Sequence, residues 1–127
     1  MNAASWKAHM PRVPLHALIW SSAQGLYELS TQGQVVRRFS PGVEAAWLTW
    51  LEGATSLAFH SPRGSLNVYQ ERRPRGGQYW YAYHTDREGI RKRYLGRTVQ
   101  VTLARLEETA QALSRAQALP LLCISLV

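Results

Sequence analysis

Residues 64–97 read GSLNVYQERRPRGGQYWYAYHTDREGIRKRYLGR, and this stretch decides the fold of the second half of the chain. It contains three short runs of residues suited to β-strands: 65–72, 78–84 and 90–95. The sequence Pro74-Arg75-Gly76-Gly77 separates the first two runs and is typical of a turn, and Gly96 closes the third run. We therefore predict a three-stranded antiparallel sheet.

The two faces of this sheet differ in chemistry, because successive side chains of a strand point to opposite sides. One face is apolar and consists of Leu66, Val68, Trp80 and Ala82. The other face consists of tyrosines: Tyr69, Tyr79, Tyr81 and Tyr83. In the third strand, Arg91 and Arg93 share one face, whereas Lys92 and Tyr94 share the other. The sequence leaves open which of these pairs accompanies the tyrosines, since it does not determine the register.

A C-terminal helix is expected to cover the apolar face. It spans about residues 102–116, and Thr102 is a suitable N-cap. Its buried stripe is expected to consist of Leu103, Leu106, Ala110 and Leu113. Glu107, Glu108 and Arg115 are expected on the solvent side.

The first half of the chain shows a similar order of elements. Three runs rich in strand-forming residues predict a β-meander: residues 15–20, 25–30 and 34–39. A helix with Glu44 in its first turn follows and ends near Gly53. Its apolar stripe is predicted to be Val43, Trp47, Trp50, Leu51 and Ala54. Residues 55–60 alternate weakly, as in a short strand.

The predicted fold class is therefore α+β: an antiparallel β-meander with a helix, followed by a three-stranded antiparallel sheet backed by a C-terminal helix. We expect four parts along the chain. They are a flexible arm at 1–14, a β-β-β-α subdomain at 15–60, a basic and aromatic β-β-β-α subdomain at 61–116, and an apolar tail at 117–127.

Composition limits the classes of partner. The 127 residues include 46% hydrophobic and 18% charged residues, so a packed core is feasible. A net charge of +7 favours an acidic partner such as DNA, RNA or an anionic surface. The single cysteine, Cys123, permits no internal disulfide and fits a cytoplasmic location. The longest apolar run, at 119–127, is far too short to span a bilayer, so we expect no membrane partner.

No set of side chains predicts catalysis, a metal site or a cofactor. His9, His16, His60 and His84 have no partners at metal-ligand spacing. The adjacent Glu107 and Glu108 point about 100° apart on a helix and do not converge for acid–base chemistry. Gly76-Gly77 lacks the Gly-Lys-Ser/Thr sequence of a phosphate-binding loop. We therefore expect a protein that is not an enzyme.

The charge is concentrated on the predicted second sheet. Residues 63–97 hold nine basic and three acidic residues, a local net charge of +6. Cations interleaved with aromatic rings suit a nucleic acid, either DNA or RNA. The predicted DNA-binding residues are Arg72, Arg73, Arg75, Tyr79, Tyr81, Tyr83, Arg91, Lys92, Arg93 and Arg97. In the alternative interpretation, the same aromatics dock a partner protein and the positive charge is incidental.

Residues 75–113 contain RGGQYWYAYH, RKRYLGR and VTLARLEETAQAL, and this block resembles the N-terminal segment of large bacterial LuxR-type, MalT-like regulators. With similar upstream pieces, the likeness covers residues 15–113. It implies a module for transcription regulation that precedes an ATPase domain. The chain has neither Walker motifs nor a C-terminal helix-turn-helix, so ATPase activity and operator recognition do not carry over.

The order of elements at 65–113 is similar to that of two DNA-binding units, the arm-type domain of tyrosine recombinases and the AP2 domain. Those domains place a three-stranded sheet, backed by one helix, in the major groove. The likeness rests on the order of elements and on the basic third strand ending in glycine, and it implies DNA binding through a sheet face.

Overall fold

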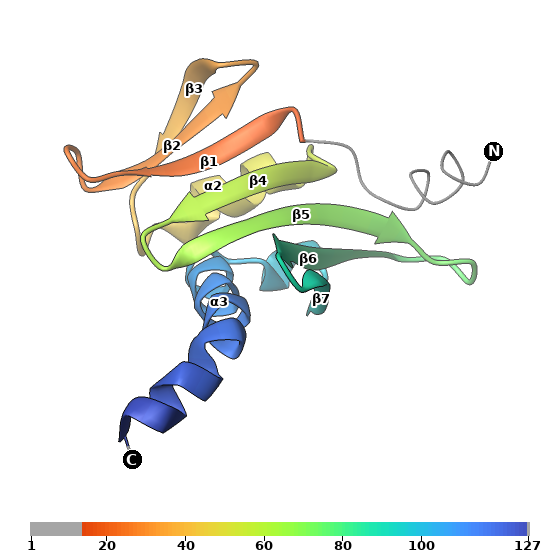
Figure 1. Ribbon diagram of the computed structural model, residues 1–127. Coiled ribbons are helices and arrows are strands. Elements are labelled where there is room, and N and C mark those ends of the chain that lie inside the picture. Colours follow the sequence, from red (N-terminus) through yellow and green to blue (C-terminus); the bar gives the residue numbers. More distant parts are fainter. Residues whose placement is uncertain (1–13, 127) are drawn as a thin grey trace.

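Seven β-strands form one continuous sheet, in the order β3-β2-β1-β4-β5-β6-β7 (Figure 1). The computed structural model describes residues 14–126, and side chains as far as residue 114. The strands are β1 (His16–Ser21), β2 (Leu26–Thr31), β3 (Gln34–Phe39), β4 (Ser56–Ser61), β5 (Gly64–Arg72), β6 (Gln78–Asp86) and β7 (Gly89–Gly96). The helices are α2 (Glu44–Leu51), a short 3-10 helix (Thr98–Gln100) and α3 (Leu103–Leu126).

The α+β class is confirmed, but the prediction of two separate antiparallel units is wrong in its detail. The two meanders belong to one mixed sheet, because β1 and β4 pair in parallel, with Leu18 beside Phe59. The crossover through α2 makes this possible, since parallel neighbours need a connection that passes over one face of the sheet. The expected boundary between residues 60 and 61 falls inside β4.

Most predicted elements lie within two residues of the observed ones, and the weakly predicted strand at 55–60 is β4, at the centre of the sheet. The C-terminal helix is longer than expected and continues ten residues beyond 116, through most of the predicted tail. Proline interrupts the hydrogen bonding of a helix without always ending it, which explains how α3 passes Pro120. The predicted arm at 1–14 lies outside the described residues, except for Pro14.

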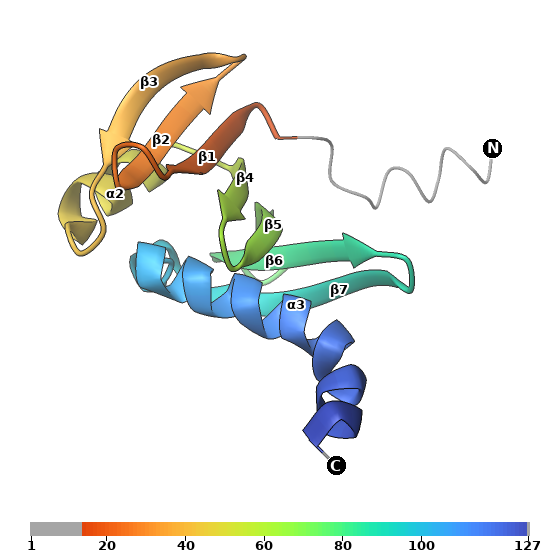
Figure 2. The same cartoon turned by 60° about the vertical axis from the view of Figure 1, so that its left-hand side comes forward.

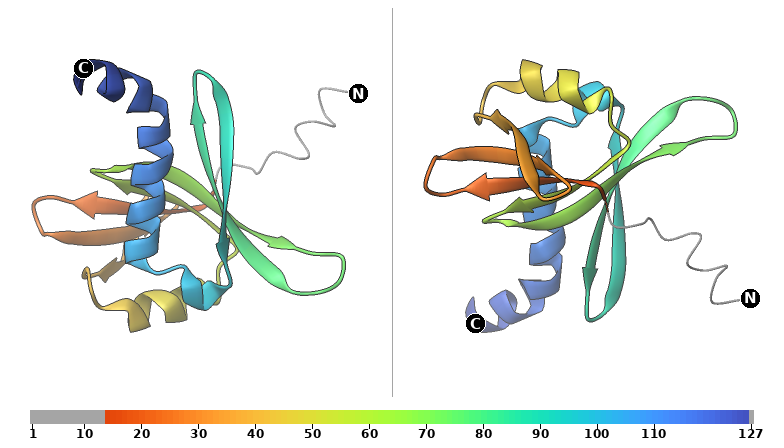
Figure 3. Two further views of the ribbon diagram at one scale, coloured as in Figure 1. Left: turned by 90° about the horizontal axis from the view of Figure 1, so that it is seen from below. Right: turned by 90° about the horizontal axis from the view of Figure 1, so that it is seen from above.

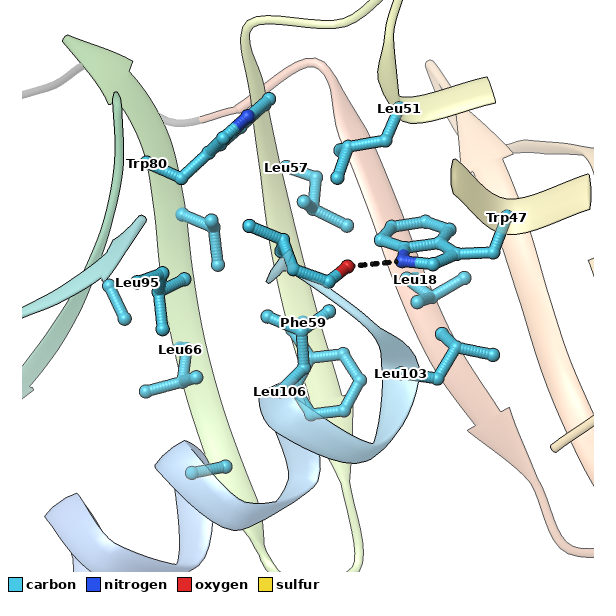
Figure 4. Close-up of a cluster of buried hydrophobic side chains, with 14 of the residues drawn as sticks. Leu18, Trp47, Leu51, Leu57, Phe59, Leu66, Trp80, Leu95, Leu103 and Leu106 are labelled. Carbon is cyan, nitrogen blue, oxygen red and sulfur yellow. Dashed lines mark hydrogen bonds between the residues drawn. The ribbon is translucent and has the colours of Figure 1, made fainter. Parts of the chain in front are cut away.

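Both helices lie on the same face of the sheet and cover one core. Figure 2 shows α2 beside the β1–β3 end and α3 running along the β5–β7 end, and Figure 3 shows α3 crossing one side of the strands. The predicted apolar face and stripe are confirmed, because Leu66, Val68, Trp80, Ala82, Leu103, Leu106, Ala110 and Leu113 are all buried. In Figure 4, the buried Trp47 indole of α2 donates a hydrogen bond to the Val101 carbonyl, 2.7 Å away.

Two details of the predicted helices differ. Val43 is 56% exposed rather than part of the stripe, because it is the N-cap residue and precedes the first turn of α2. Glu107 does not simply face solvent, since its carboxylate accepts a hydrogen bond from the hydroxyl of the buried Tyr27. Burial and this hydrogen bond both raise the pKa of Tyr27 well above its ordinary value.

Helix α3 begins where two side chains cap it. Thr102 Oγ1 accepts the Arg105 N–H at 3.1 Å, which confirms the predicted N-cap. The carboxylate of Glu44, in the first turn of α2, accepts the N–H groups of Leu103 at 2.8 Å and Ala104 at 3.4 Å. The Glu44 carboxylate therefore lies at the N-terminal ends of both α2 and α3, where the helix dipoles favour a negative charge.

Candidate functional site

The register of β6 and β7 determines which side chains accompany the tyrosines. Tyr81 lies opposite Tyr94, and Tyr83 lies opposite Lys92. Lys92 and Tyr94 therefore accompany the tyrosines on the side of the sheet that the helices leave uncovered. Tyr69 of β5 lies opposite Tyr81 on the same side. We call this surface the tyrosine face, and it consists of Tyr69, Glu71, Tyr79, Tyr81, Tyr83, Lys92 and Tyr94.

The rings of the tyrosine face contact one another across the three strands. Tyr69 and Tyr83 meet edge to face with centroids 5.7 Å apart, and Tyr81 and Tyr94 do so at 5.4 Å. Tyr79 lies 6.0 Å from Tyr94. Such cross-strand aromatic pairs stabilise a sheet even where solvent reaches them. Tyr94 is the most open of the five rings and is 45% exposed.

Two cations lie against these rings. The Arg73 guanidinium lies 4.3 Å from the Tyr79 centroid and donates a hydrogen bond to the Tyr81 hydroxyl at 2.8 Å. This hydrogen bond is the main cause of the raised pKa of Arg73. The Lys92 ammonium lies 4.3 Å from the Tyr81 centroid. Both contacts are within cation–π range, so these two cations lie along the face rather than standing out from it.

Glu71 is the acidic member of the tyrosine face. Its carboxylate accepts a hydrogen bond from the Tyr83 hydroxyl and lies 3.2 Å from the Lys92 ammonium. Burial, and then the Glu71 contact, raises the pKa of Tyr83. Burial alone would lower the pKa of Lys92, but its hydrogen bonds to Tyr83 and Glu71 outweigh it and raise that pKa. Burial, followed by the neighbouring Tyr83, raises the pKa of Tyr69 to about 12.

The loop between β5 and β6 extends the face at one end. Gly76 and Gly77 adopt φ values of 91° and 89°, which favour glycine. A Cβ on Gly77 would also lie 2.8 Å from the Tyr79 ring, so glycine lets that ring lie over the loop. Arg72 and Arg75 are exposed here, and Arg73, Pro74, Arg75, Gly76 and Tyr79 line an open hollow of about 500 Å³.

The structure brings together only part of the predicted set. Arg91 and Arg93 belong to the helix-covered side, because Arg93 lies opposite the buried Ala82. Arg72 lies opposite Gln78, on the side of β5 that holds Leu66 and Val68, so it also points away from the tyrosines. Arg91 is 3.0 Å from Asp86 and 3.3 Å from Glu88, and it donates to the Leu113 carbonyl of α3 at 3.1 Å. It therefore joins the β6–β7 hairpin to α3. Arg93 is exposed at the edge of the sheet, and the exposed Arg97 lies 5.9 Å from the Tyr79 centroid.

A groove of about 210 Å³ adjoins the tyrosine face at Tyr83. It is lined mainly by His60, Ser65, Asn67, Tyr83, His84 and Thr85. His84 Nδ1 donates to the Ser65 carbonyl at 3.0 Å, and His60 Nδ1 lies 3.2 Å from the Ser65 hydroxyl. Sequence reasoning missed this groove, because it forms only when β4, β5 and β6 are neighbours. It also left Tyr69, Glu71 and Tyr94 out of the site, although their alternation with Tyr81 and Tyr83 could have included them.

Comparison with known proteins yields no relative: no family model, no curated protein and no solved structure matches the chain. Among the described residues, no three His, Cys, Asp or Glu side chains are grouped so that they could hold a metal ion. Within the same part of the chain, neither helix combines the length and the apolar character needed to cross a membrane.

Proposed function

We propose that this protein binds nucleic acid through the tyrosine face and the basic loop beside it. The observation that carries the proposal is the position of five tyrosine rings on the uncovered side of a sheet, next to Arg73, Arg75 and Arg97. Aromatic rings bordered by cations match a ligand with flat bases and a phosphate backbone. The proposed role is binding without catalysis, in the cytoplasm.

The cations differ in how they can meet phosphate. Arg75 and Arg97 are exposed and border the tyrosine face, so they can neutralise phosphates directly. Arg72 points to the other side of β5 and is left out of the proposed site. Arg73 and Lys92 already contact tyrosines, and each adds positive charge close to the rings. Arg91 is left out of the proposed site, because Asp86 and Glu88 neutralise it.

A role in transcription regulation is the more specific part of the proposal. It rests on the resemblance of residues 75–113 to the N-terminal segment of MalT-like regulators, and a DNA ligand follows from that role. In this regulatory role the protein would bind DNA and would also contact an ATPase domain, on the same or another chain.

Salt dependence tests the proposal. We expect labelled DNA to bind in fluorescence anisotropy titrations at low salt, with affinity that falls as NaCl increases. Three arginines, Arg73, Arg75 and Arg97, correspond to a log–log slope of about −2.7 on duplex DNA, or about −2.1 on a single strand. The absence of binding at about 50 mM NaCl, in the range where such contacts are strong, would disprove the proposal.

A matched pair of double variants distinguishes a localised site from general attraction to a basic protein. Arg75→Ala/Arg97→Ala should weaken binding and reduce the magnitude of the salt slope by about two units. Arg37→Ala/Arg38→Ala removes the same charge from β3, four strands away from β5. At about 4.8 Å per strand this is about 19 Å, beyond the screening length of about 10 Å, so this control should bind nearly as well as the wild type. Equal losses would contradict a localised site.

A second candidate function is docking of a partner protein. It is favoured by the exposed apolar area on the same face, where Tyr94 is 45% and Ile90 is 43% exposed, and by the engagement of Arg73 and Lys92 with tyrosines. Aromatic residues are enriched in protein interfaces. Binding that is nearly independent of salt would support this alternative.

A further inference from the structure

The cations within the tyrosine face do not project far enough to contact base edges in the major groove of a duplex. A side chain that reads bases in the major groove must reach into a channel about 8.5 Å deep. The two cations within this face instead lie flat against the rings. Arg73 lies 4.3 Å from the Tyr79 centroid and donates to the Tyr81 hydroxyl. Lys92 lies 4.3 Å from the Tyr81 centroid and pairs with the Glu71 carboxylate. In an unpaired strand, by contrast, the bases are free to approach the rings.

The arrangement of charge fits an unpaired strand as well. The exposed arginines border the rings at the β5–β6 loop, at Arg75, and beyond β7, at Arg97. An aromatic centre with a basic border matches a ligand whose bases point toward the protein while its phosphates follow the border. Tyr94, 45% exposed at the centre of the Tyr79–Tyr81 contacts, offers a ring for stacking. Arg73 can add a guanidinium plane.

The groove next to Tyr83 supplies hydrogen-bonding groups at the other end of the face. The Asn67 side chain is half-buried in its lining and makes no hydrogen bond within the described residues. An amide offers both donors and an acceptor, as the edge of a base requires. A volume of about 210 Å³ is below that of pockets for drug-sized ligands, and suits a fragment such as one base.

We infer that the tyrosine face and the adjoining groove bind single-stranded nucleic acid in preference to duplex, with one base against Tyr94 and another at Asn67. This inference rests on the proposed nucleic-acid binding and specifies its ligand. It excludes insertion of the three-stranded sheet into a major groove as the main binding mode.

Competition between strand forms is the direct test. A labelled oligo(dT) strand and an oligo(dT)·oligo(dA) duplex of equal length are titrated with the full chain in the same buffer. We expect the single strand to bind at least about tenfold more tightly. Equal or tighter binding of the duplex would overturn the inference while leaving nucleic-acid binding intact, whereas failure of both probes to bind would remove the proposed function itself.

Three variants then locate the bases. Tyr94→Leu should weaken single-strand binding by about 5- to 150-fold, the range given by stacking one base on one ring, and Tyr94→Phe should bind like the wild type. Asn67→Ala should weaken it by about 2- to 12-fold, as loss of one hydrogen bond does. Each variant is first required to melt like the wild type, which the exposure of Tyr94 makes achievable. Wild-type affinity in Tyr94→Leu would overturn the stacking assignment, and wild-type affinity in Asn67→Ala would remove the groove from the site.

Discussion

The meander β1–β3 and the meander β5–β7 have the same sequence of elements but opposite use of their aromatic residues. In the first, Tyr27 and Phe39 are buried, and they pack with Phe59 and Trp47. Within β5–β7, all of which the structure describes, Trp80 is the only buried aromatic side chain, and five tyrosines lie on the uncovered face. Burial therefore explains the aromatics of the first meander, but it does not explain those of the second.

Charge separates the two regions in the same way. Residues 15–60 contain two arginines and three glutamates, a net charge of −1, whereas residues 63–97 carry +6. Charged side chains contribute little to stability at exposed positions, so an uneven distribution of this size is not needed for folding. The comparison supports the proposal that the second meander carries a surface for a partner, whereas the first mainly supports the fold.

The largest expected effect is on folding stability, and it comes from comparing a buried and an exposed aromatic residue within the second meander. Trp80 is fully buried and its indole donates to Thr98 Oγ1 at 2.9 Å, whereas Tyr94 is 45% exposed on the opposite side. Trp80→Ala should lower the free energy of unfolding by about 3–5 kcal/mol. Tyr94→Ala should lower it by about 1 kcal/mol or less, since it loses one exposed cross-strand contact. Urea denaturation of both variants measures this, and the reverse ranking would mean that the tyrosine face is structural.

A turn glycine in each half provides the second comparison. Gly64 begins β5 with φ of +149°, and a Cβ there would lie 2.4 Å from Ser114 Oγ and 2.9 Å from the Ala110 carbonyl oxygen of α3. Gly25, between β1 and β2, has φ of +68° and nothing within 4 Å of a Cβ. Gly64→Ala should cost about 2–4 kcal/mol, from strain and from displacement of the helix, and Gly25→Ala about 1–2 kcal/mol.

Thermal melts of the two glycine variants measure these losses. Both substitutions place alanine at positive φ, and the excess loss in Gly64→Ala combines the greater backbone strain at φ of +149° with the close approach of α3 to the β4–β5 turn. Equal destabilisation would indicate that α3 shifts at little cost, which would weaken the view that it holds the second meander in place.

Much of this comparison could be predicted from the sequence, because it depends on local periodicity. The alternation at 78–84 indicated correctly that Trp80 and Ala82 are buried and that the tyrosines are on the other side. The stripe from Leu103 to Leu113 likewise identified the buried side of α3. These patterns have periods of 2 and 3.6 residues, which one segment displays without reference to any other.

The remainder depends on pairings between distant segments. The parallel pairing of β1 with β4 joins the two meanders, and no local pattern encodes it. The register shift between Trp80 and Tyr81 helps to set which residues of β7 pair with β6. Arg91 was predicted to bind a ligand, and the sequence did not reveal that it contacts Asp86 and the Leu113 carbonyl instead. The groove at Asn67 requires three strands to be in register, so it too could be found only in the structure.

The smallest expected effect concerns a hydroxyl of the tyrosine face. The pKa of Tyr69 is about 12 in the folded protein, mainly because of burial, against about 10 in an unfolded chain. The folded state therefore keeps a proton that the unfolded state loses between these values. The stability that Tyr69 contributes is fully present below about pH 10 and is lost as pH rises toward 12. Tyr27 of the first meander should behave in the same direction, since burial and Glu107 raise its pKa as well.

Tyr69→Phe sharpens this comparison, because phenylalanine ionises in neither state. Urea denaturation at about pH 9 and about pH 11 should show a smaller loss of stability in Tyr69→Phe than in the wild type, by about 1 kcal/mol or less once solvent screening of a partly exposed ring is included. Measurements at about pH 7 and pH 9 serve as the control, since the difference between the two proteins should be constant there. If the two proteins lose the same stability up to pH 11, the ring of Tyr69 is as accessible to solvent as in the unfolded chain. The tyrosine face would then be more open than the contacts of Tyr69 with Tyr83 indicate, which would favour ligand access across β5 as well as at Tyr94.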